Sequence, residues 1–384
     1  MKVLIAIDSF KGSLTSMQAG QAAASGIKRV YPEAETMVRP IADGGEGTVN
    51  ALVDGMGGEM QVIQVTGPLG QAVDAEYGII SSSKTAIIEM SAAAGITLVP
   101  DKERNPLNTT TYGVGEMIID AIKKGCRNFI VGIGGSATND GGVGMLQALG
   151  FGFWNKEGVA ISLGGKGLGE LVHITDDKAL PELKECTFHI ACDVTNPLCG
   201  PKGCSAIYGP QKGADAAMIE QMDQWLLDYS ELVKKIRPDA DKDFPGAGAA
   251  GGIGYAFLSF LNGQLKNGID LILRETRLEQ YIKQADIVIT GEGRLDAQTT
   301  MGKAPSGIAS IAKKYDKPVI GFAGCVTEDA GACNQCGIDA FFPVLRKVCT
   351  LEEAMDTDNA YANMAATVEQ VFRLIHTVLG EKEL

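Results

Sequence analysis

The chain has 384 residues, which is more than one hydrophobic core usually accommodates, so two domains are expected. Hydrophobic residues make up 45% of the chain and charged residues 21%, and the formal net charge is −13. Nucleic acid and anionic membranes both require a basic face, so neither is expected as a partner of so acidic a chain.

The first 60 residues have the pattern of a parallel sheet. The sequence predicts strands at 2–8 and 36–41, each followed by a helix, the first over 16–30 and the second ending near 54. Strands that alternate with helices are typical of β–α–β units, whose strands run parallel.

The pattern changes after Gly57-Gly58. Three short strands are predicted at 61–66, 75–80 and 85–90, and their connections are too short for crossovers, which indicates an antiparallel meander. A helix at 113–124 then leads to a strand that ends at Gly132, and a further strand is predicted at 187–193. This middle stretch is interpreted as a second α/β domain with a mixed sheet.

The alternating pattern resumes near the C-terminus, with strands at 286–290, 318–323 and 340–344 and helices at 305–314 and 352–379. Five strands can thus share one doubly wound parallel sheet. The predicted domains are 1–60 together with 285–384, and an inserted domain at 61–284. No apolar stretch reaches membrane-spanning length, and the nine cysteines lack zinc-ligand spacing, so a cytoplasmic chain with reduced thiols is expected.

The segment "GIGGSATNDGG" at 132–142 indicates a loop that contacts phosphate, because it combines many glycines, which leave the backbone accessible, with hydroxyl side chains. It lacks the lysine of a P-loop, so its charge must come from elsewhere. A second glycine-rich segment spans 244–257. It is either a close-packed helix start or a helix N-terminus that receives an anion.

Acidic residues recur just after the predicted strands, where ligands of open α/β sheets bind. They can collect Mg²⁺ or act as bases, or they can simply cap helices and end strands. These residues are Asp8, Asp43, Glu46, Asp140, Asp193, Glu292 and Asp296. Lys11 and Arg294 are the cations beside them, and Lys202 and Lys303 are weaker candidates.

Six motifs together resemble the bacterial glycerate kinase family, nearly end to end and in the family's order. They are "DSFKGSLTS" at 8–16, "PIADGGEGT" at 40–48, "GIGGSATNDGG" at 132–142, "CDVTNPLCGP" at 192–201, "PGAGAAGGIG" at 245–254 and "TGEGRLDAQT" at 290–299. The resemblance implies a flavodoxin-like domain carrying an inserted domain with a restriction-endonuclease-like core, and an active site in the cleft between them.

The resemblance also implies ATP-dependent phosphorylation of D-glycerate, with 2-phosphoglycerate favoured over 3-phosphoglycerate as the product. ATP and Mg²⁺ are the expected cofactors. Two alternatives are a kinase of another small hydroxy acid and a non-catalytic sensor of a phosphorylated acid. A homodimer is left open.

The candidate site residues fall into four groups. The catalytic group is Lys11, Asp193, Arg294 and Asp296, with Asp193 the preferred base and Asp296 the second choice. The nucleotide-binding group is Gly134, Gly135, Ser136, Thr138, Asn139, Gly248, Gly251 and Gly252. The substrate-binding group is Asp8, Ser9, Lys11, Asp43, Gly44, Gly45, Glu46 and Glu292. The metal-binding group is Asp193 and Asp140.

Overall fold

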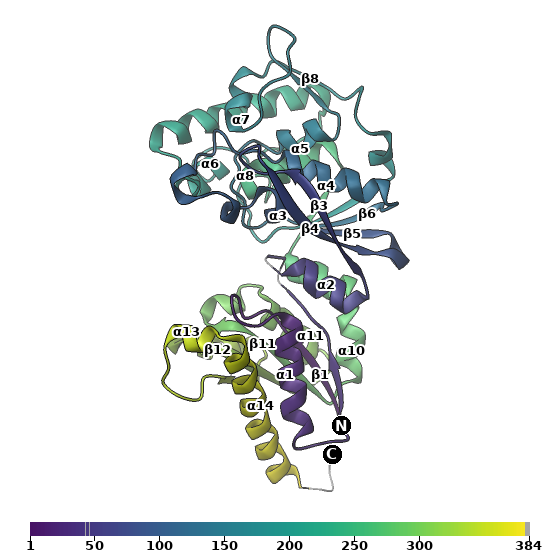
Figure 1. Cartoon of the computed structure of the whole chain (residues 1–384), viewed down its shortest axis with the longest axis vertical. Coiled ribbons are helices and arrows are strands. Elements are labelled where there is room, and N and C mark those ends of the chain that lie inside the picture. Colours follow the sequence, from purple (N-terminus) through teal and green to yellow (C-terminus); the bar gives the residue numbers. More distant parts are fainter. Residues whose placement is uncertain (43, 46, 381–384) are drawn as a thin grey trace. The chain divides into compact units, whose positions relative to one another are not determined.

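The computed structural model describes residues 1–42, 44–45 and 47–380, and the chain folds into two compact units (Figure 1). Unit 1 comprises Met1–Asp43, Asn50–Met56 and Ile269–Leu384, and unit 2 comprises Gly44–Val49 and Gly57–Gly268. Each unit contains a β-sheet with packed helices, so the predicted α/β class is confirmed.

Unit 1 is built on a five-stranded parallel sheet in the order β13-β12-β11-β1-β2. Its strands are β1 (Lys2–Ile7), β2 (Glu35–Val38), β11 (Ile287–Leu295), β12 (Val319–Val326) and β13 (Ala340–Pro343). As predicted, the N-terminal and C-terminal strands share this sheet, since Val3 of β1 pairs in parallel with Ile287 of β11.

The helices of unit 1 cover both faces of the sheet because every other residue of β1 faces the same side. Val3, Ile5 and Ile7 pack with α1 and α14, whereas Leu4 and Ala6 pack with α9, α10 and α11. The helices are α1 (Ser16–Lys28), α9 (Gly268–Glu275), α10 (Leu278–Gln284), α11 (Ala304–Lys313), α12 (Ala332–Gln335), α13 (Leu351–Met355) and α14 (Thr357–Leu379), and α2 (Thr48–Met56) spans a boundary between the units. Helices α1 and α14 lie side by side (Figure 1).

Unit 2 has a six-stranded mixed sheet in the order β10-β9-β6-β5-β4-β3. The predicted meander is present, because β3 pairs antiparallel with β4 and β4 with β5, whereas β5, β6, β9 and β10 run parallel. The strands are β3 (Glu59–Thr66), β4 (Ala72–Ile80), β5 (Thr85–Glu89), β6 (Asn128–Gly132), β9 (Thr187–Ala191) and β10 (Gln264–Lys266), with a separate hairpin of β7 (Gly152–Trp154) and β8 (His173–Thr175).

One continuous hydrophobic core lies under this sheet, and the rings of Phe129 on β6 and Phe188 on β9 stack within it at 4.8 Å. The helices of unit 2 are α3 (Ser91–Ala94), α4 (Tyr112–Lys123), α5 (Val143–Ala148), α6 (Cys204–Tyr208), α7 (Ala216–Ile236) and α8 (Ala249–Phe260). Among the described residues, no helix combines the length and the apolar character that crossing a membrane would need.

Three sequence expectations differ from the structure. The first boundary, predicted at 60/61, falls at 56/57, and Gly44–Val49 also belongs to unit 2. The second boundary falls at 268/269 and not at 284/285, because Ile269, Leu273 and Ile282 bury their side chains in the core of unit 1. The helix predicted over 352–379 is two helices. Asp356 has extended backbone angles (φ −58°, ψ 128°) and accepts a hydrogen bond from Asn359 N as the N-cap of α14.

Candidate active site

The first group of predicted residues lies at the carboxyl edge of the parallel sheet in unit 1. The strand order reverses between β1 and β11, since β1 is followed by β2 on one side and β11 by β12 on the other. Ligands of open α/β sheets bind at such a reversal. Asp8 directly follows β1 and donates its backbone N–H to Gly291 O at 2.8 Å, and Glu292 is the next residue of β11. Both acids are at least nine-tenths buried.

Lys11 and Ser9 lie beside these acids. Ser9 N donates to Asp8 Oδ1 at 2.6 Å. Lys11 belongs to a tight turn in which Phe10 N donates to Leu14 O at 2.8 Å and Gly12 takes a φ of +76°. The turn packs on β11, because a methyl group on Gly293 would lie 3.6 Å from Phe10 Cα and 3.8 Å from Lys11 N. The side chain of Lys11 is exposed and forms no ion pair with any residue that the structure describes.

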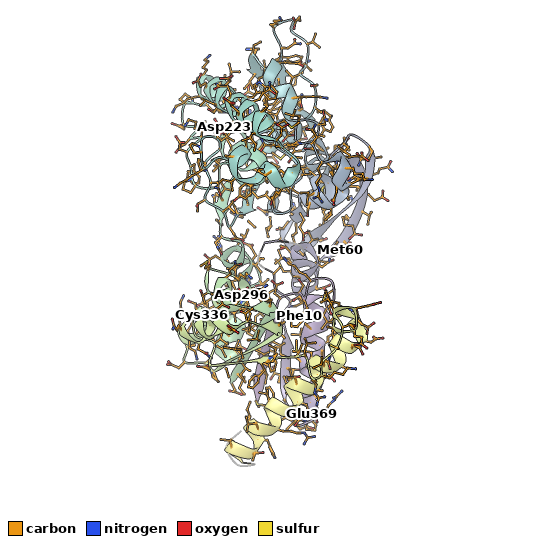
Figure 2. All side chains as sticks on the ribbon, turned by 90° about the vertical axis from the view of Figure 1, so that its left-hand side faces the viewer. Phe10, Met60, Asp223, Asp296, Cys336 and Glu369 are labelled. Carbon is orange, nitrogen blue, oxygen red and sulfur yellow. The ribbon has the colours of Figure 1, made fainter. Side chains whose placement is uncertain are left out.

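Glu292 is held by two side chains from the segment that follows β11. Thr299 donates its hydroxyl to Glu292 Oε1 at 2.6 Å, and Lys303 donates to Glu292 Oε2 at 3.3 Å. The second candidate base, Asp296, is engaged in the same segment. Its Oδ1 accepts from Gln298 N and Thr299 N at 2.9 and 3.3 Å, and its Oδ2 lies 3.1 Å from Arg294 Nε. Asp296 is labelled in Figure 2.

The second group lies in unit 2, at the carboxyl ends of its parallel strands. Asp193 follows β9 and is exposed, and its Oδ1 accepts from Gly268 N at 2.8 Å. Gly44 lies against the same edge with a φ of +94°, and a methyl group there would be 2.9 Å from Ala191 Cβ and 3.9 Å from Asp193 Oδ2. Gly45 O accepts the hydroxyl of Thr48 at 2.7 Å. The predicted site residues Asp43 and Glu46 lie outside the described residues.

The glycine-rich loop follows β6. Gly134 and Gly135 are exposed, whereas Ser136, Thr138 and Asn139 are buried beneath them. The loop is tied down by Ile96 N, which donates to Gly135 O at 2.8 Å, and by Ala137 N, which donates to Ala94 O at 2.9 Å. Within the described residues, the backbone N–H groups of Gly134, Gly135 and Ser136 have no acceptor. Consecutive N–H groups with a positive φ, here +72° at Gly135, are typical of anion-binding loops.

A buried lysine lies behind this loop. Lys212 is 2% exposed, and its Nζ donates to Ser136 Oγ at 2.8 Å and to Thr138 O at 2.7 Å. Burial lowers the pKa of Lys212 to about 8, although Cys204 and Asp140 act in the opposite direction. Sequence reasoning missed this residue and singled out the exposed Lys202 ten positions earlier. The available signal was "GPQKGA", which places a lysine directly before a glycine in the same glycine-rich stretch.

Asp140, predicted to bind metal, is instead an anchor of the loop. Its Oδ2 accepts from Thr111 N, Thr111 Oγ1 and Gly144 N at 2.8, 2.9 and 3.4 Å, and its Oδ1 accepts from Gly142 N at 3.1 Å. The residue is 1% exposed, and burial raises its pKa against the effect of these donors. Both oxygens therefore have protein partners, and the arrangement does not fit a metal ligand.

The second glycine-rich segment packs against the first. Gly248, Gly251 and Gly252 are buried, and a methyl group on Gly251 would collide with Thr138 O while one on Gly248 would collide with Pro197 O. Gly251 and Gly252 take φ values of +71° and +96°, and Gly251 O accepts from Gly141 N at 2.9 Å. The structure thus favours the close-packed alternative over direct contact with an anion.

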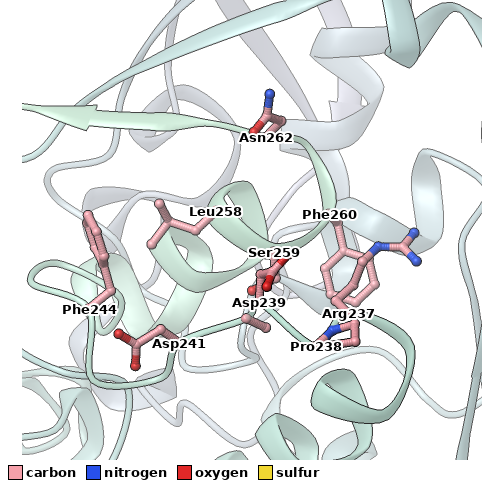
Figure 3. A pocket seen from close by; sticks show the side chains of 10 residues that line it. Arg237, Pro238, Asp239, Asp241, Phe244, Leu258, Ser259, Phe260 and Asn262 are labelled. Atoms are coloured by element: carbon pink, nitrogen blue, oxygen red, sulfur yellow. The ribbon is translucent and has the colours of Figure 1, made fainter.

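A separate surface pocket of about 500 Å³ lies in unit 2 (Figure 3). Arg237, Asp241 and Phe244 line it together with the end of α8, and no predicted site residue contributes. Among the described residues, no three His, Cys, Asp or Glu side chains are grouped so that they could hold a metal ion.

Comparisons with known proteins identify the family of the chain. The model of the glycerate kinase family matches residues 3–376. The chain is 49% identical over 373 residues to glycerate 2-kinase of Escherichia coli K12, which covers 96% of this chain and 98% of that protein. It is 46% identical to glycerate kinase of Bacillus subtilis 168, with 95% and 96% covered.

Among solved structures, the fold matches a crystal structure assigned to glycerate kinase 2 from Salmonella typhimurium LT2. The TM-score is 0.91, the sequence identity is 44%, and the match covers 98% of this chain and 99% of that one. A family model that spans nearly the whole chain, together with relatives of this identity, establishes membership. The chain belongs to the glycerate kinase family and is a phosphotransferase.

Proposed function

We propose that the protein phosphorylates D-glycerate with ATP. The observation that carries the proposal is the row of backbone N–H groups at Gly134, Gly135 and Ser136, which have no acceptor among the described residues; the two glycines are exposed and Ser136 is buried. Such groups bind phosphate oxygens without bringing any negative charge. The family relationship supplies the reaction class, and relatives named glycerate kinase supply the acceptor.

The acceptor side of the proposal rests on unit 1. Glycerate is a carboxylate, and the exposed Lys11, which has no ion-pair partner among the described residues, can bind it as a point charge. Arg294 is 64% exposed at its side chain and is already oriented by Asp296, so it serves the same anion or the phosphoryl group. Asp8, Ser9 and Glu292 are proposed to line the substrate site together with these cations. Gly44 and Gly45 are further proposed substrate contacts.

The base in this proposal is Asp193. It is exposed at the carboxyl edge and its Oδ1 is fixed by Gly268 N, whereas both oxygens of Asp296 take part in capping or in the ion pair with Arg294. A general base must reach the attacking hydroxyl, and a carboxylate that is exposed and oriented meets that need better.

Mg²⁺ is the proposed metal, held by Asp193 and by the nucleotide phosphates. Mg²⁺ in kinases usually binds one or two carboxylates together with phosphate oxygens and water. The exposed carboxylate of Asp193 fits that description and the buried Asp140 does not. When bound, the ion would offset the phosphate charge.

We propose 2-phosphoglycerate as the product, supported by the 49% identical relative that is named glycerate 2-kinase. For the fold, we propose that unit 1 is flavodoxin-like. Renumbered within the unit, its strand order is 2-1-3-4-5, which is the flavodoxin order. The antiparallel-then-parallel sheet of unit 2 supports a restriction-endonuclease-like core.

The test is ADP release that depends on both ATP and D-glycerate, followed by ³¹P and ¹³C NMR of the product. Glycerate-dependent ADP release with phosphate on the 2-oxygen is the expected result. Nucleotide binding without turnover would identify a sensor instead. Turnover with another hydroxy acid but not with glycerate would show a different kinase.

A further inference from the structure

We propose that Lys212 is the positioning residue of the phosphate loop, supplying from behind the positive charge that the loop sequence lacks. The inference rests on the proposed nucleotide-binding role of residues 134–139. It assigns Lys212 no contact with the reacting atoms, and its effect passes through Ser136 and the peptide unit after Thr138.

The first argument is the setting of the Lys212 ammonium group. It is buried, and in the part of the chain that the structure describes, no carboxylate lies within ion-pair distance of it. Removing a charge from water without a paired opposite charge is costly. An ammonium group has three N–H donors, and two of them are used here, on Ser136 Oγ and Thr138 O. A buried charge of this kind is characteristic of functional sites.

The second argument concerns the Ser136 hydroxyl. An ammonium group can only donate, so Ser136 Oγ must accept from Lys212, and its own hydrogen is left to donate elsewhere. No acceptor for that hydrogen occurs among the described residues. Lys212 therefore turns Ser136 into a polarised donor, next to the unpaired N–H groups of Gly134 and Gly135.

The third argument concerns the Thr138 carbonyl. In a trans peptide unit the C=O and the following N–H point in opposite directions. Because Lys212 holds Thr138 O, the N–H of Asn139 is directed away from the lysine. One further buried polar atom of the loop, Thr138 Oγ1, has no hydrogen-bond partner within the described residues, and as a hydroxyl it has a hydrogen to donate. The loop therefore carries several donors without a protein acceptor among the described residues, and Lys212 holds Ser136 Oγ and Thr138 O in place beside them.

The test is nucleotide binding by Lys212→Met, which keeps most of the side-chain volume but removes the charge and the donors. We expect the Kd for MgADP, measured by calorimetry, to rise at least about tenfold, the usual effect of losing a charge-assisted hydrogen bond. The KM for D-glycerate should stay within about twofold of wild type. Lys235→Met, an exposed lysine on α7, is the matched control and should change neither value.

A double-mutant cycle tests the route through Ser136. If Lys212 acts through that hydroxyl, the effects of Ser136→Ala and Lys212→Met on the Kd should be strongly non-additive. Fully additive effects would overturn the proposed route. An unchanged Kd in Lys212→Met would overturn the inference as a whole.

If Lys212→Met does not fold, the wild-type protein provides the test. The groups that face the ammonium are Ser136, Thr138, Cys204 and Asp140, and burial raises the pKa of Cys204 to about 12, so that thiol stays neutral at alkaline pH. Nucleotide Kd should rise as pH passes through about 8, and a flat profile up to pH ~9.5 would contradict the proposal. If wild type does not phosphorylate glycerate but these effects on nucleotide Kd are observed, the proposed function is refuted and the inference about Lys212 is not.

Discussion

Single residues of this site were partly predictable from sequence. A carboxylate after an apolar strand indicates a position at the carboxyl edge, and Asp8, Asp193 and Glu292 all lie there. The same pattern misled for Asp140, because sequence does not show how many donors will surround a side chain. Lys212 was missed because its importance comes from burial against Ser136, a residue 76 positions away, and no local pattern records that contact.

Asp193→Asn tests the assigned base. Asparagine is nearly isosteric but cannot accept the proton, so kcat should fall about 10²- to 10⁴-fold with a small change in the KM for glycerate. Steady-state kinetics at several Mg²⁺ concentrations provide the measurement. Rescue of kcat by excess Mg²⁺ would show that Asp193 acts chiefly as a metal ligand, and a kcat within a few-fold of wild type would contradict both roles.

Asp140→Ala tests the anchor. The substitution leaves the donors of Thr111, Gly142 and Gly144 buried without an acceptor, so the free energy of unfolding should fall by about 3–5 kcal/mol. Urea denaturation measures this loss. The folded fraction of the variant should need the same Mg²⁺ concentration for activity as wild type. A higher Mg²⁺ requirement without a loss of stability would show that Asp140 is a metal ligand after all.

Lys212 also predicts how stability depends on pH. Its folded pKa of about 8 lies below the ordinary value of 10.5, so the unfolded chain binds more protons between these two values. The contribution of Lys212 to the free energy of unfolding therefore rises with pH between these two values, because at lower pH protonation of the lysine favours the unfolded state. Compared with Lys212→Met by urea denaturation, wild type should gain stability from pH ~8 to ~10, by an amount on the order of 3 kcal/mol. A constant difference between the two proteins would show that the lysine is not desolvated.

At the scale of elements, strands and the helices that alternate with them were predicted well because their period and turn residues are local signals. The β-strands of the parallel sheet and the β3-β4-β5 meander were found near their predicted bounds. Elements whose place in the fold depends on tertiary contacts were not predicted. Helices α9 and α10 belong to unit 1 through their buried apolar faces, and the break at Asp356 appears only as a capping hydrogen bond.

Gly26→Ala tests the packing of α1 on α14. A methyl group at this position would lie far inside contact distance of Ala365 O, a backbone atom that cannot turn away. Overpacking of this kind costs about 1–3 kcal/mol, so the melting temperature should drop by several degrees. Gly331→Ala, where no atom lies within 4 Å of the added methyl, is the control. Equal melting temperatures for the two variants would show that the helices move apart at little cost.

On the scale of the whole molecule, a net charge of −13 makes a nucleotide triphosphate an unfavourable partner unless its charge is offset. Activity should therefore be lost in excess EDTA and return with Mg²⁺ or Mn²⁺. A coupled ADP assay measures this, with nucleotide binding followed in parallel. Full activity without a divalent cation would require the protein's own cations to neutralise the phosphates.

The pairing of β1 with β11 determines the order in which the two units can fold during synthesis. Val3 cannot pair with Ile287 until the ribosome has synthesised most of the chain, whereas unit 2 ends at Gly268 and is complete earlier. Folded unit 2 brings its own two chain ends together, since a methyl group on Gly44 would lie 3.0 Å from Gly268 Cα. Once unit 2 has formed, the first and last segments of unit 1, Met1–Asp43 and Ile269–Leu384, are joined as if by a short linker, and closing the long loop carries little further entropic cost.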